Sequence, residues 1–497
     1  MGSSKQIATG VAWTIILNIV NGIYGFISVP ILIAYFGKTD YGLIGLAMSV
    51  NVYLRLLDLG FNSTNVRFFS NWLVKKDYNK VNKLFQTSLS FYGFIGIINT
   101  IVLLFISLFS NIIFNVTPEQ DILVKHLLYI LAISAFISWF TSCFDQLIVA
   151  NEQVGWVKRM YLLPKLFQIG VLALTVILKF SIEVYYALTA FSMFVILPLF
   201  VFKIRKICPF ISFRPYFDKG IFKEVLPYCI NIFSFSIFQF SITHLRPVFL
   251  GIESTPDSIA EYNVLNGIIQ AVLMLGGAFV GVILPSASKV VANNNIIAQN
   301  RIAYKGTKYI SITLCFCCFG MMCIAPEILT AYVGENFLHL EVWLDIWLLA
   351  TVCSHNQAIS GLILAGSDIR AITYSSLVAA IIGLILCWIL IPIYNVGGTV
   401  ISYLVYCLIQ ILFFYFYYWP KVMKLSSIKI FFKSVAPFLL IGGVVCLIIR
   451  MIDIEGGAWT GLLFKGSIFM ITYYSIVFFV LDEEDKSYFK NLVKRTN

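Results

Sequence analysis

The sequence has few charged residues. Of its 497 residues only 12% are Asp, Glu, Lys or Arg, whereas 60% are hydrophobic, and the mean hydropathy is +0.89. Soluble domains carry about 25% charged residues, so the composition excludes an ordinary soluble protein. The apolar segments are continuous and do not alternate with polar residues, which excludes an outer-membrane barrel. We therefore predict an all-α polytopic membrane protein.

The chain also lacks the residue patterns of a metal site or a catalytic centre. There are four histidines, and the eleven cysteines lie almost all within apolar segments without zinc-site spacing. We expect these cysteines to be small buried residues. No paired-carboxylate or nucleophile constellation stands out, and every loop on the side poor in Lys and Arg is short. The sequence thus predicts a protein that is not an enzyme and has no metal or other cofactor.

The apolar segments predict about fourteen transmembrane helices, each near the length that crosses a bilayer. Short connections leave no room for a soluble domain. We divide the chain into an N-lobe (1–210), a C-lobe (211–425) and a last part (426–497) that holds two further helices and a tail. The predicted spans lie near 11–36, 41–69, 84–109, 122–150, 160–179, 183–203, 223–250, 259–287, 305–333, 340–366, 371–392, 396–419, 430–450 and 459–481.

The positive residues behind the net charge of +11 are unevenly distributed among the loops. Lys and Arg gather in alternate loops, for example in 75–83, 203–223 and 421–433, whereas the other loops collect Asp and Glu. Excess positive charge marks cytoplasmic loops. We therefore expect both termini in the cytoplasm and see no need for a nucleic-acid partner.

Two stretches of the chain resemble each other. LIVANEQVGWVKRMYLL ends the fourth predicted span, and LILAGSDIRAITYSSLV ends the tenth, so that residues 147–150 match 362–365. Copies of about six spans each would have the same orientation and form parallel repeats. Proteins built this way usually bind their substrate between the lobes and alternate access to it.

A polar stripe runs through the second predicted span, at residues 41–70. Asn51, Arg55, Asp58, Asn62 and Asn65 recur at steps of four, three, four and three, which places them on one face of a helix. A charge in the hydrocarbon core costs about 2.5–3.5 kcal/mol on insertion scales, so the stripe should not face lipid. Two interpretations stay open: the stripe lines a transport pathway, or it joins helices through polar contacts.

Further charged residues lie inside predicted spans. Three basic residues, Arg55, Lys165 and Arg246, stand against two acidic ones, Asp58 and Asp145. A cavity that they line would be mildly cationic and would favour an anionic substrate. Arginine offers forked donors that suit phosphate or pyrophosphate. Lys165 and Arg246 have an alternative role, because both could reach the headgroups instead.

The two carboxylates, Asp58 and Asp145, are the candidates for coupling to H⁺ or Na⁺. The alternative is that they only compensate the charge of Arg55 and its neighbours. The stripe is not repeated in the second half of the chain. We therefore expect pathway chemistry mainly in the N-lobe.

The whole chain resembles the Wzx-type polysaccharide flippases of the polysaccharide transporter family, in the MATE/MOP flippase superfamily. The resemblance rests on PILIAYFGKTDYGLIGLAMSV and LLDLGFNSTNVRFF. A Gly-x-x-x-Tyr-Gly element opens the second span in that family, here as Gly37, Tyr41 and Gly42. A Leu-Gly pair and an Arg close it, here Leu59, Gly60 and Arg67.

The resemblance implies a function. The protein would move undecaprenyl-pyrophosphate-linked oligosaccharide repeat units to the outer leaflet of a bacterial inner membrane, for O-antigen, capsule or exopolysaccharide. A polysaccharide polymerase or ligase would then use them. Arg55 would be the main headgroup contact, helped by Lys165 and Arg246, and Asn51 and Asn62 would bind sugar hydroxyls. Two alternatives remain: a multidrug or cation extruder of the same superfamily, and a membrane polysaccharide polymerase.

Overall fold

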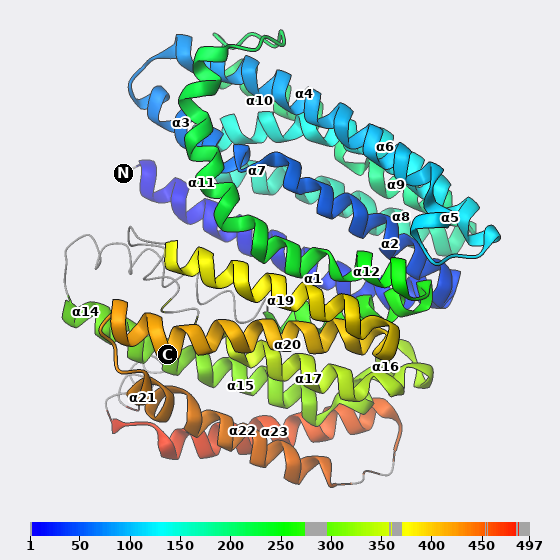
Figure 1. Cartoon of the computed structure of the whole chain (residues 1–497), viewed down its shortest axis with the longest axis vertical. Coiled ribbons are helices and arrows are strands. Elements are labelled where there is room, and N and C mark those ends of the chain that lie inside the picture. Colours follow the sequence, from blue (N-terminus) through cyan, green and yellow to red (C-terminus); the bar gives the residue numbers. More distant parts are fainter. Residues whose placement is uncertain are drawn as a thin grey trace. The chain divides into compact units, whose positions relative to one another are not determined.

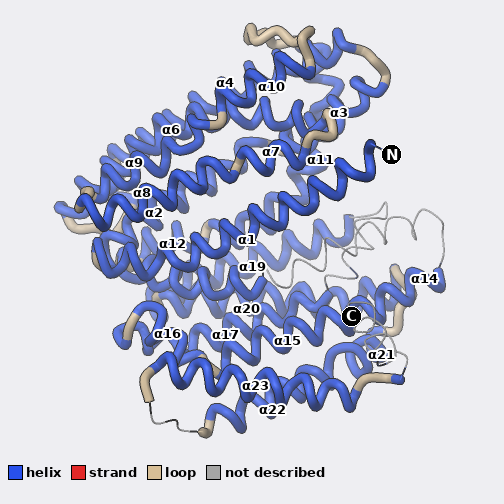
Figure 2. Tube along the Cα trace, turned by 180° about the vertical axis from the view of Figure 1, so that it is seen from behind, coloured by secondary structure: helices blue, strands red, loops and turns tan. Residues whose placement is uncertain are grey.

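The computed structural model describes residues 2–273, 296–356, 359, 370–452, 454, 456–483 and 486. Among these residues there are helices and connecting loops but no strand (Figures 1 and 2). In a bilayer core the backbone groups have no water to bind, and a helix satisfies all of them within one segment. The predicted all-α fold is confirmed.

Within the described residues, eleven helices are long and apolar enough to cross a membrane, and two bent pairs raise the number to thirteen. Predicted spans at 259–287 and 340–366, and the repeated motif at 362–365, fall partly or wholly outside the described residues. The protein is a multi-pass membrane protein. The eleven unbroken candidate spans are Ala12–Phe36, Tyr78–Leu108, Pro118–Ala150, Val154–Leu178, Ile182–Ile207, Gln299–Cys323, Glu335–His355, Thr373–Tyr394, Val396–Val422, Ser427–Arg450 and Ala458–Val480.

The chain forms two compact units. The first comprises Met1–Asn263 with Cys387–Thr399, and the second comprises Val264–Leu386 with Val400–Asn497. The lobe boundaries after residues 210 and 425 stay a prediction.

In the first unit, α4 (Tyr78–Leu108) and α6 (Pro118–Ala150) run side by side (Figures 1 and 2). The Asp77 side chain caps α4 by accepting from the Lys80 amide, and Thr117 opens α6 with a capping box to Gln120. Gly96 lets the helices approach closely, because a Cβ there would lie 3.1 Å from the Phe136 ring. Close contact through a small residue is how membrane helices pack.

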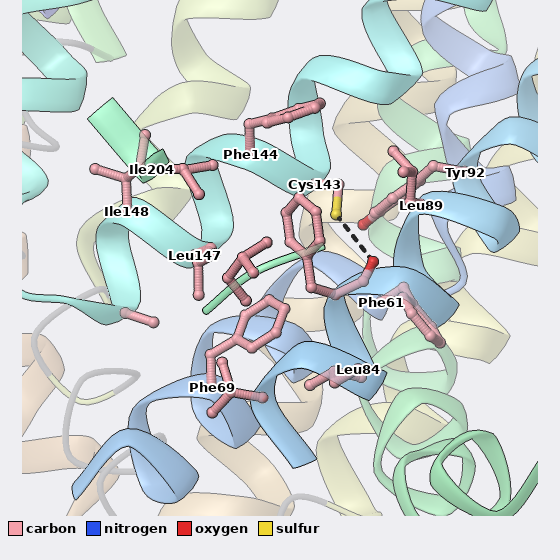
Figure 3. Close-up of a cluster of buried hydrophobic side chains, with 14 of the residues drawn as sticks. Phe61, Phe69, Leu84, Leu89, Tyr92, Cys143, Phe144, Leu147, Ile148 and Ile204 are labelled. Atoms are coloured by element: carbon pink, nitrogen blue, oxygen red, sulfur yellow. Dashed lines mark hydrogen bonds between the residues drawn. The ribbon is translucent and has the colours of Figure 1, made fainter. Parts of the chain in front are cut away.

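A cluster of buried side chains, many of them aromatic, joins α3 (Phe61–Val74) to α4 and α6. Figure 3 shows Phe61, Phe69, Phe144 and Leu147 in this cluster, with the Cys143 thiol donating to the Phe85 carbonyl at 3.7 Å. All eleven cysteines are free, and most are buried, which confirms their predicted role as small core residues.

The long helix α11 (Lys219–His244) packs on α2 (Lys38–Leu54), α3 and α4. Asp218 caps it by accepting from the amides of Gly220 and Ile221, and the Lys83 ammonium lies 3.2 Å from its carboxylate. The amide hydrogen bond from Ile221, followed by Lys83, lowers the pKa of Asp218 below its ordinary value. These contacts fix the loop before α11, and so they fix where α11 begins beside the second span.

Two glycines on α2 allow tight packing against the segment at residues 256–263. A Cβ on Gly42 would lie 1.9 Å from the Pro256 carbonyl oxygen, and one on Gly45 would lie 2.1 Å from the side-chain nitrogen Nδ2 of Asn263. Lys38 and Thr39, at the start of α2, bind the same segment through Glu261 (2.7 Å) and Asp257 (2.6 Å). The beginning of the second span is therefore fixed by one close backbone approach and by side-chain contacts.

The variant Gly42→Ala is expected to destabilise the protein by about 1–3 kcal/mol, because the new methyl group overlaps a backbone atom that cannot rotate away. The matched control is Gly25→Ala, since a Cβ at Gly25 meets nothing within 4 Å and Ala is the better helix former. Thermal unfolding of both variants in detergent checks the prediction. Equal midpoints would show that this contact is looser than the structure indicates.

In the second unit, α15 (Thr307–Cys323) packs on α17 (Glu341–Val352), α22 (Ala436–Arg450) and α23 (Ala458–Val480). The Lys465 ammonium on α23 lies 2.6 Å from a carboxylate oxygen of Glu327, and both side chains are nearly buried. Arg450, at the end of α22, bridges Asp345 (2.6 Å) and Glu341. These ion pairs fasten the last two helices to the rest of the unit.

Candidate functional site

The second span is broken in its middle. Helix α2 ends at Leu54, a short 3-10 turn covers Arg55–Asp58, and α3 begins at Phe61 after a bend of 41°. Leu59 and Gly60 have φ of 50° and 77°, and a Cβ on Gly60 would lie 2.8 Å from the Cys229 carbonyl, so only glycine fits there. The prediction of one continuous helix over 41–69 is wrong at this point, because the Leu-Gly pair adopts the left-handed conformation and interrupts the span.

The break gives Asp58 a structural role. Its Oδ2 accepts from the Asn62 amide at 3.1 Å, in the first turn of α3. That amide has no partner within the helix, and negative charge is favoured at a helix N-terminus. The sequence signal for this was present in Asp58-Leu59-Gly60, since Asp and Gly close together are typical of a turn.

A polar cavity of about 380 Å³ opens at this break, inside the first unit. It brings together five of the predicted residues: Asn51, Arg55, Asp58 and Asn62 from the second span, and Asp145 from α6. Its other lining residues come mainly from α6. They are Asn99, Ser138, Trp139, Thr141, Ser142, Tyr161 and Met193.

A chain of buried hydrogen bonds leads away from Asp58. The Tyr92 hydroxyl donates to Asp58 Oδ1 at 2.8 Å and accepts from Gln146 Nε2 at 2.7 Å. Gln146 Oε1 in turn accepts from Asn65 Nδ2 at 2.8 Å. Because each member holds the next in a medium of low dielectric constant, the network fixes the position of the Asp58 carboxylate.

Asp145 is held on one side only. Its Oδ2 accepts from the Tyr161 hydroxyl at 2.6 Å, whereas its Oδ1 is buried and has no hydrogen-bond partner among the described residues. Asn99 Oδ1 is in the same state. A buried acceptor without a partner costs about 1–3 kcal/mol. Two such oxygens on the wall of one cavity are therefore suited to receive a proton, a water molecule or a donor group of a ligand.

Lys165 and Arg246 lie elsewhere in the first unit. The Lys165 ammonium binds Gln168 Oε1 at 2.8 Å and lies 4.3 Å from the centre of the Tyr24 ring. Arg246, 2% exposed, donates to the carbonyls of Ile242 (2.9 Å) and Thr399 (3.4 Å). Neither side chain lines the cavity, and their role in substrate binding stays a prediction.

The charge of the cavity follows from this placement. Arg55 is the one basic side chain among the lining residues, against the carboxylates of Asp58 and Asp145. The excess of positive charge that the sequence predicts is therefore not found in this cavity. Arg55 and Asn62 are exposed, so their polar groups are open to a ligand.

Several residues of the site were not identified from the sequence. Tyr92, Asn99 and Tyr161 line the cavity or hold its carboxylates. Asn99 lies in an otherwise apolar segment, GIINTIVLL, and this isolated amide is a signal that could have found it. The two tyrosines give no such signal, because tyrosine is common in membrane helices.

The fold has close likenesses among solved structures. The chain superposes on a structure described as "Lipid II flippase MurJ, inward closed conformation" with a TM-score of 0.74, at 16% identity, over 97% of this chain and 99% of that one. An inward-facing multidrug resistance MATE family transporter of the MOP superfamily gives a TM-score of 0.56, at 14% identity, over 88% and 100%. A eukaryotic MATE transporter gives 0.56, at 14% identity, over 88% and 99%. The fold is that of a multi-span transporter.

The sequence itself gives the family. The model of the family described as "Polysaccharide biosynthesis protein" matches residues 7–291, more than half of the chain. The chain belongs to this polysaccharide biosynthesis family, which confirms the resemblance drawn from its motifs. The comparison with curated protein sequences finds no match.

Proposed function

We propose that the protein is a flippase that moves undecaprenyl-pyrophosphate-linked oligosaccharide repeat units from the cytoplasmic to the outer leaflet of a bacterial inner membrane. Family membership and the transporter fold support a lipid-linked substrate. The observation that carries the proposal is a polar cavity with an exposed guanidinium inside a helix bundle that is otherwise apolar. Transport by alternating access needs no covalent chemistry.

The roles of the cavity residues follow from their chemistry. The Arg55 guanidinium can form two parallel hydrogen bonds to a pyrophosphate, which fixes orientation as well as charge. Asn51, Asn62 and Asn99 offer amide donors and acceptors that match sugar hydroxyls. The polyprenyl chain is apolar and can stay in the bilayer. A polymerase or ligase would take up the unit after transport.

The experiment that tests this proposal uses purified protein in liposomes. A fluorescent undecaprenyl-pyrophosphate oligosaccharide is placed in both leaflets, and an impermeant reductant bleaches the outer pool. We expect the protein to expose the inner pool at a rate well above that of protein-free liposomes. Equal rates would overturn the proposal.

A second candidate is an extruder of cationic drugs. It is favoured by one observation, namely that two carboxylates and one guanidinium line the cavity. The same liposomes, loaded with ethidium, discriminate between the two functions. Ethidium transport without lipid movement would assign the cavity to cations.

Asp145 is our first candidate for coupling to protons, with Asp58 second. Both Asp58 oxygens accept hydrogen bonds, whereas Asp145 Oδ1 has no hydrogen-bond partner among the described residues. The variant Asp145→Asn keeps the Tyr161 contact but cannot exchange a proton. We expect a pH gradient that accelerates the wild type to have no effect on this variant, although slow transport without a gradient remains. Glu119→Gln, an exposed site on the same helix, is the control. If the variant still responds to the gradient, or responds instead to a sodium gradient, Asp145 is not the proton carrier.

A further inference from the structure

A large apolar groove lies in the second unit. Its volume is about 720 Å³, within the range of small-molecule pockets. Leu412 and Phe416 on its wall are 51% and 75% exposed, so the groove opens sideways where a membrane helix meets lipid. An occupant would therefore come from the bilayer. The lining residues are Leu349, Val352, Cys353, His355, Ile411, Leu412, Tyr415, Phe416, Pro420, Ser426, Ser427, Ile428, Phe431, Phe432 and Leu439.

Two irregular helical stretches shape this groove. Phe414–Val422 and Phe431–Val435 are both π-helical, and each contributes aromatic side chains to the wall. A third π-helical stretch, Ile302–Gly306, packs behind them through Ala303 in the cluster that contains Trp419. Such stretches make up well under 1% of residues and often occur at functional sites. Three π-helical stretches therefore lie around one groove. This indicates that the groove has a shape that regular α-helices would not give.

The groove is apolar along its length and polar at one end. His355 is satisfied, because its Nδ1 donates to the Val352 carbonyl (2.9 Å) and its Nε2 then accepts from the Tyr415 hydroxyl (2.9 Å). Ser427, the first residue of its span, differs: its Oγ is buried and has no hydrogen-bond partner among the described residues. A free hydroxyl therefore lies at the end of the groove, at the membrane boundary.

Positive charge surrounds that end. Residues 421–433 contain four lysines and no acidic residue. The ammonium groups of Lys421 and Lys429 lie over the rings of Tyr417 (5.5 Å) and Tyr304 (5.2 Å), which are outside the groove lining. The Tyr304 hydroxyl accepts from the amide of Ser426, a lining residue, at 3.3 Å, so Lys429 is held beside the groove. Basic clusters next to a membrane helix attract anionic lipid headgroups.

We propose that this groove binds an anionic phospholipid of the leaflet at the lysine-rich end. One acyl chain lies along Leu349, Ile411 and Leu439, and the phosphate meets Ser427 and the lysines. The apolar length of the groove matches an acyl chain, and its basic, polar end matches the phosphate headgroup. Its sideways opening lets such a lipid enter from the bilayer. The proposal is independent of what the polar cavity transports.

Native mass spectrometry of the full chain in detergent, with equal amounts of phosphatidylglycerol and phosphatidylcholine, tests the proposal. We expect phosphatidylglycerol to be retained preferentially. The double variant Lys429→Gln/Lys433→Gln should weaken its binding about 25-fold, since one lysine near an anionic headgroup accounts for about fivefold. The control Lys206→Gln/Lys219→Gln removes the same charge from the first unit and should change nothing.

A second pair of variants tests the apolar part. Leu439→Trp fills the groove and should abolish retention, whereas Leu440→Trp, next to it but 68% exposed and outside the groove, should not. Equal retention of both lipids, or unchanged binding in the lysine variant, would overturn the proposal even if the filled variant does not fold. Displacement of phosphatidylglycerol by an equal amount of undecaprenyl phosphate would also overturn it, and would assign the groove to polyprenyl lipids.

Discussion

The variant Arg55→Gln is expected to flip lipid-linked oligosaccharide about ten- to a hundredfold more slowly than the wild type. Hydrogen bonds to charged groups contribute about 1.5–3 kcal/mol, and the lost interaction is with the pyrophosphate. Arg55→Lys should fall between the two, because an ammonium keeps the charge but not the forked geometry. The liposome bleaching assay measures all three rates.

A matched control separates binding from folding. Arg67 lies on α3, in the other half of the same broken span, and stacks on Tyr228 at 4.2 Å outside the cavity. Arg67→Gln should leave the flipping rate within about threefold of the wild type, because a single cation–π contact is weak. If Arg55→Gln flips substrate at the wild-type rate, the assignment of Arg55 to the headgroup is wrong.

The variant Lys465→Met is expected to reduce the free energy of unfolding by about 3–5 kcal/mol. It leaves the Glu327 carboxylate buried without its cation, and an uncompensated buried charge is costly. Gly461 adds to the constraint, because a Cβ there would lie 2.9 Å from Glu327 Cγ, which leaves the carboxylate little space to move. Thermal unfolding in detergent should show a midpoint lower by about 5 °C.

The double variant Glu327→Gln/Lys465→Met removes the unpaired charge and should recover most of the lost stability. Recovery would show that the cost arises from the orphaned carboxylate and not from lost packing. If the single variant is as stable as the wild type, or the double variant is no better than the single one, the ion pair does not fasten α23 as the structure indicates.

The sequence predicted those parts of the molecule that depend on local pattern. Continuous apolar runs located the helices, because only helices of that composition satisfy the backbone in lipid. The spacing of Asn51, Arg55, Asp58 and Asn62 placed them on one face, and they do line one cavity. Asn65, the fifth member of the predicted stripe, lies beyond the break at Gly60 and does not line the cavity; it is buried and donates to Gln146 instead.

The sequence could not give side-chain directions or the contacts between distant segments. Depth in the membrane can be read from the sequence, but the direction of a long side chain cannot. The Lys165 ammonium contacts Gln168 and Tyr24, and Arg246 donates to backbone carbonyls, so neither lines this cavity, and their part in substrate binding stays a prediction. Lys465, in the last span, gave no clue to its partner Glu327, because the two meet only in the folded unit.

The most direct test of the central claim is made in a strain that lacks this protein. The measurement is the amount and leaflet of lipid-linked repeat units, together with the surface polysaccharide. Our account predicts loss of polymer, with full-length repeat units trapped on the cytoplasmic side, and rescue by the wild type but not by Arg55→Gln. Repeat units that reach the outer leaflet but stay unpolymerised would contradict it and indicate a polymerase. An unchanged glycan profile would also contradict it and favour the drug extruder.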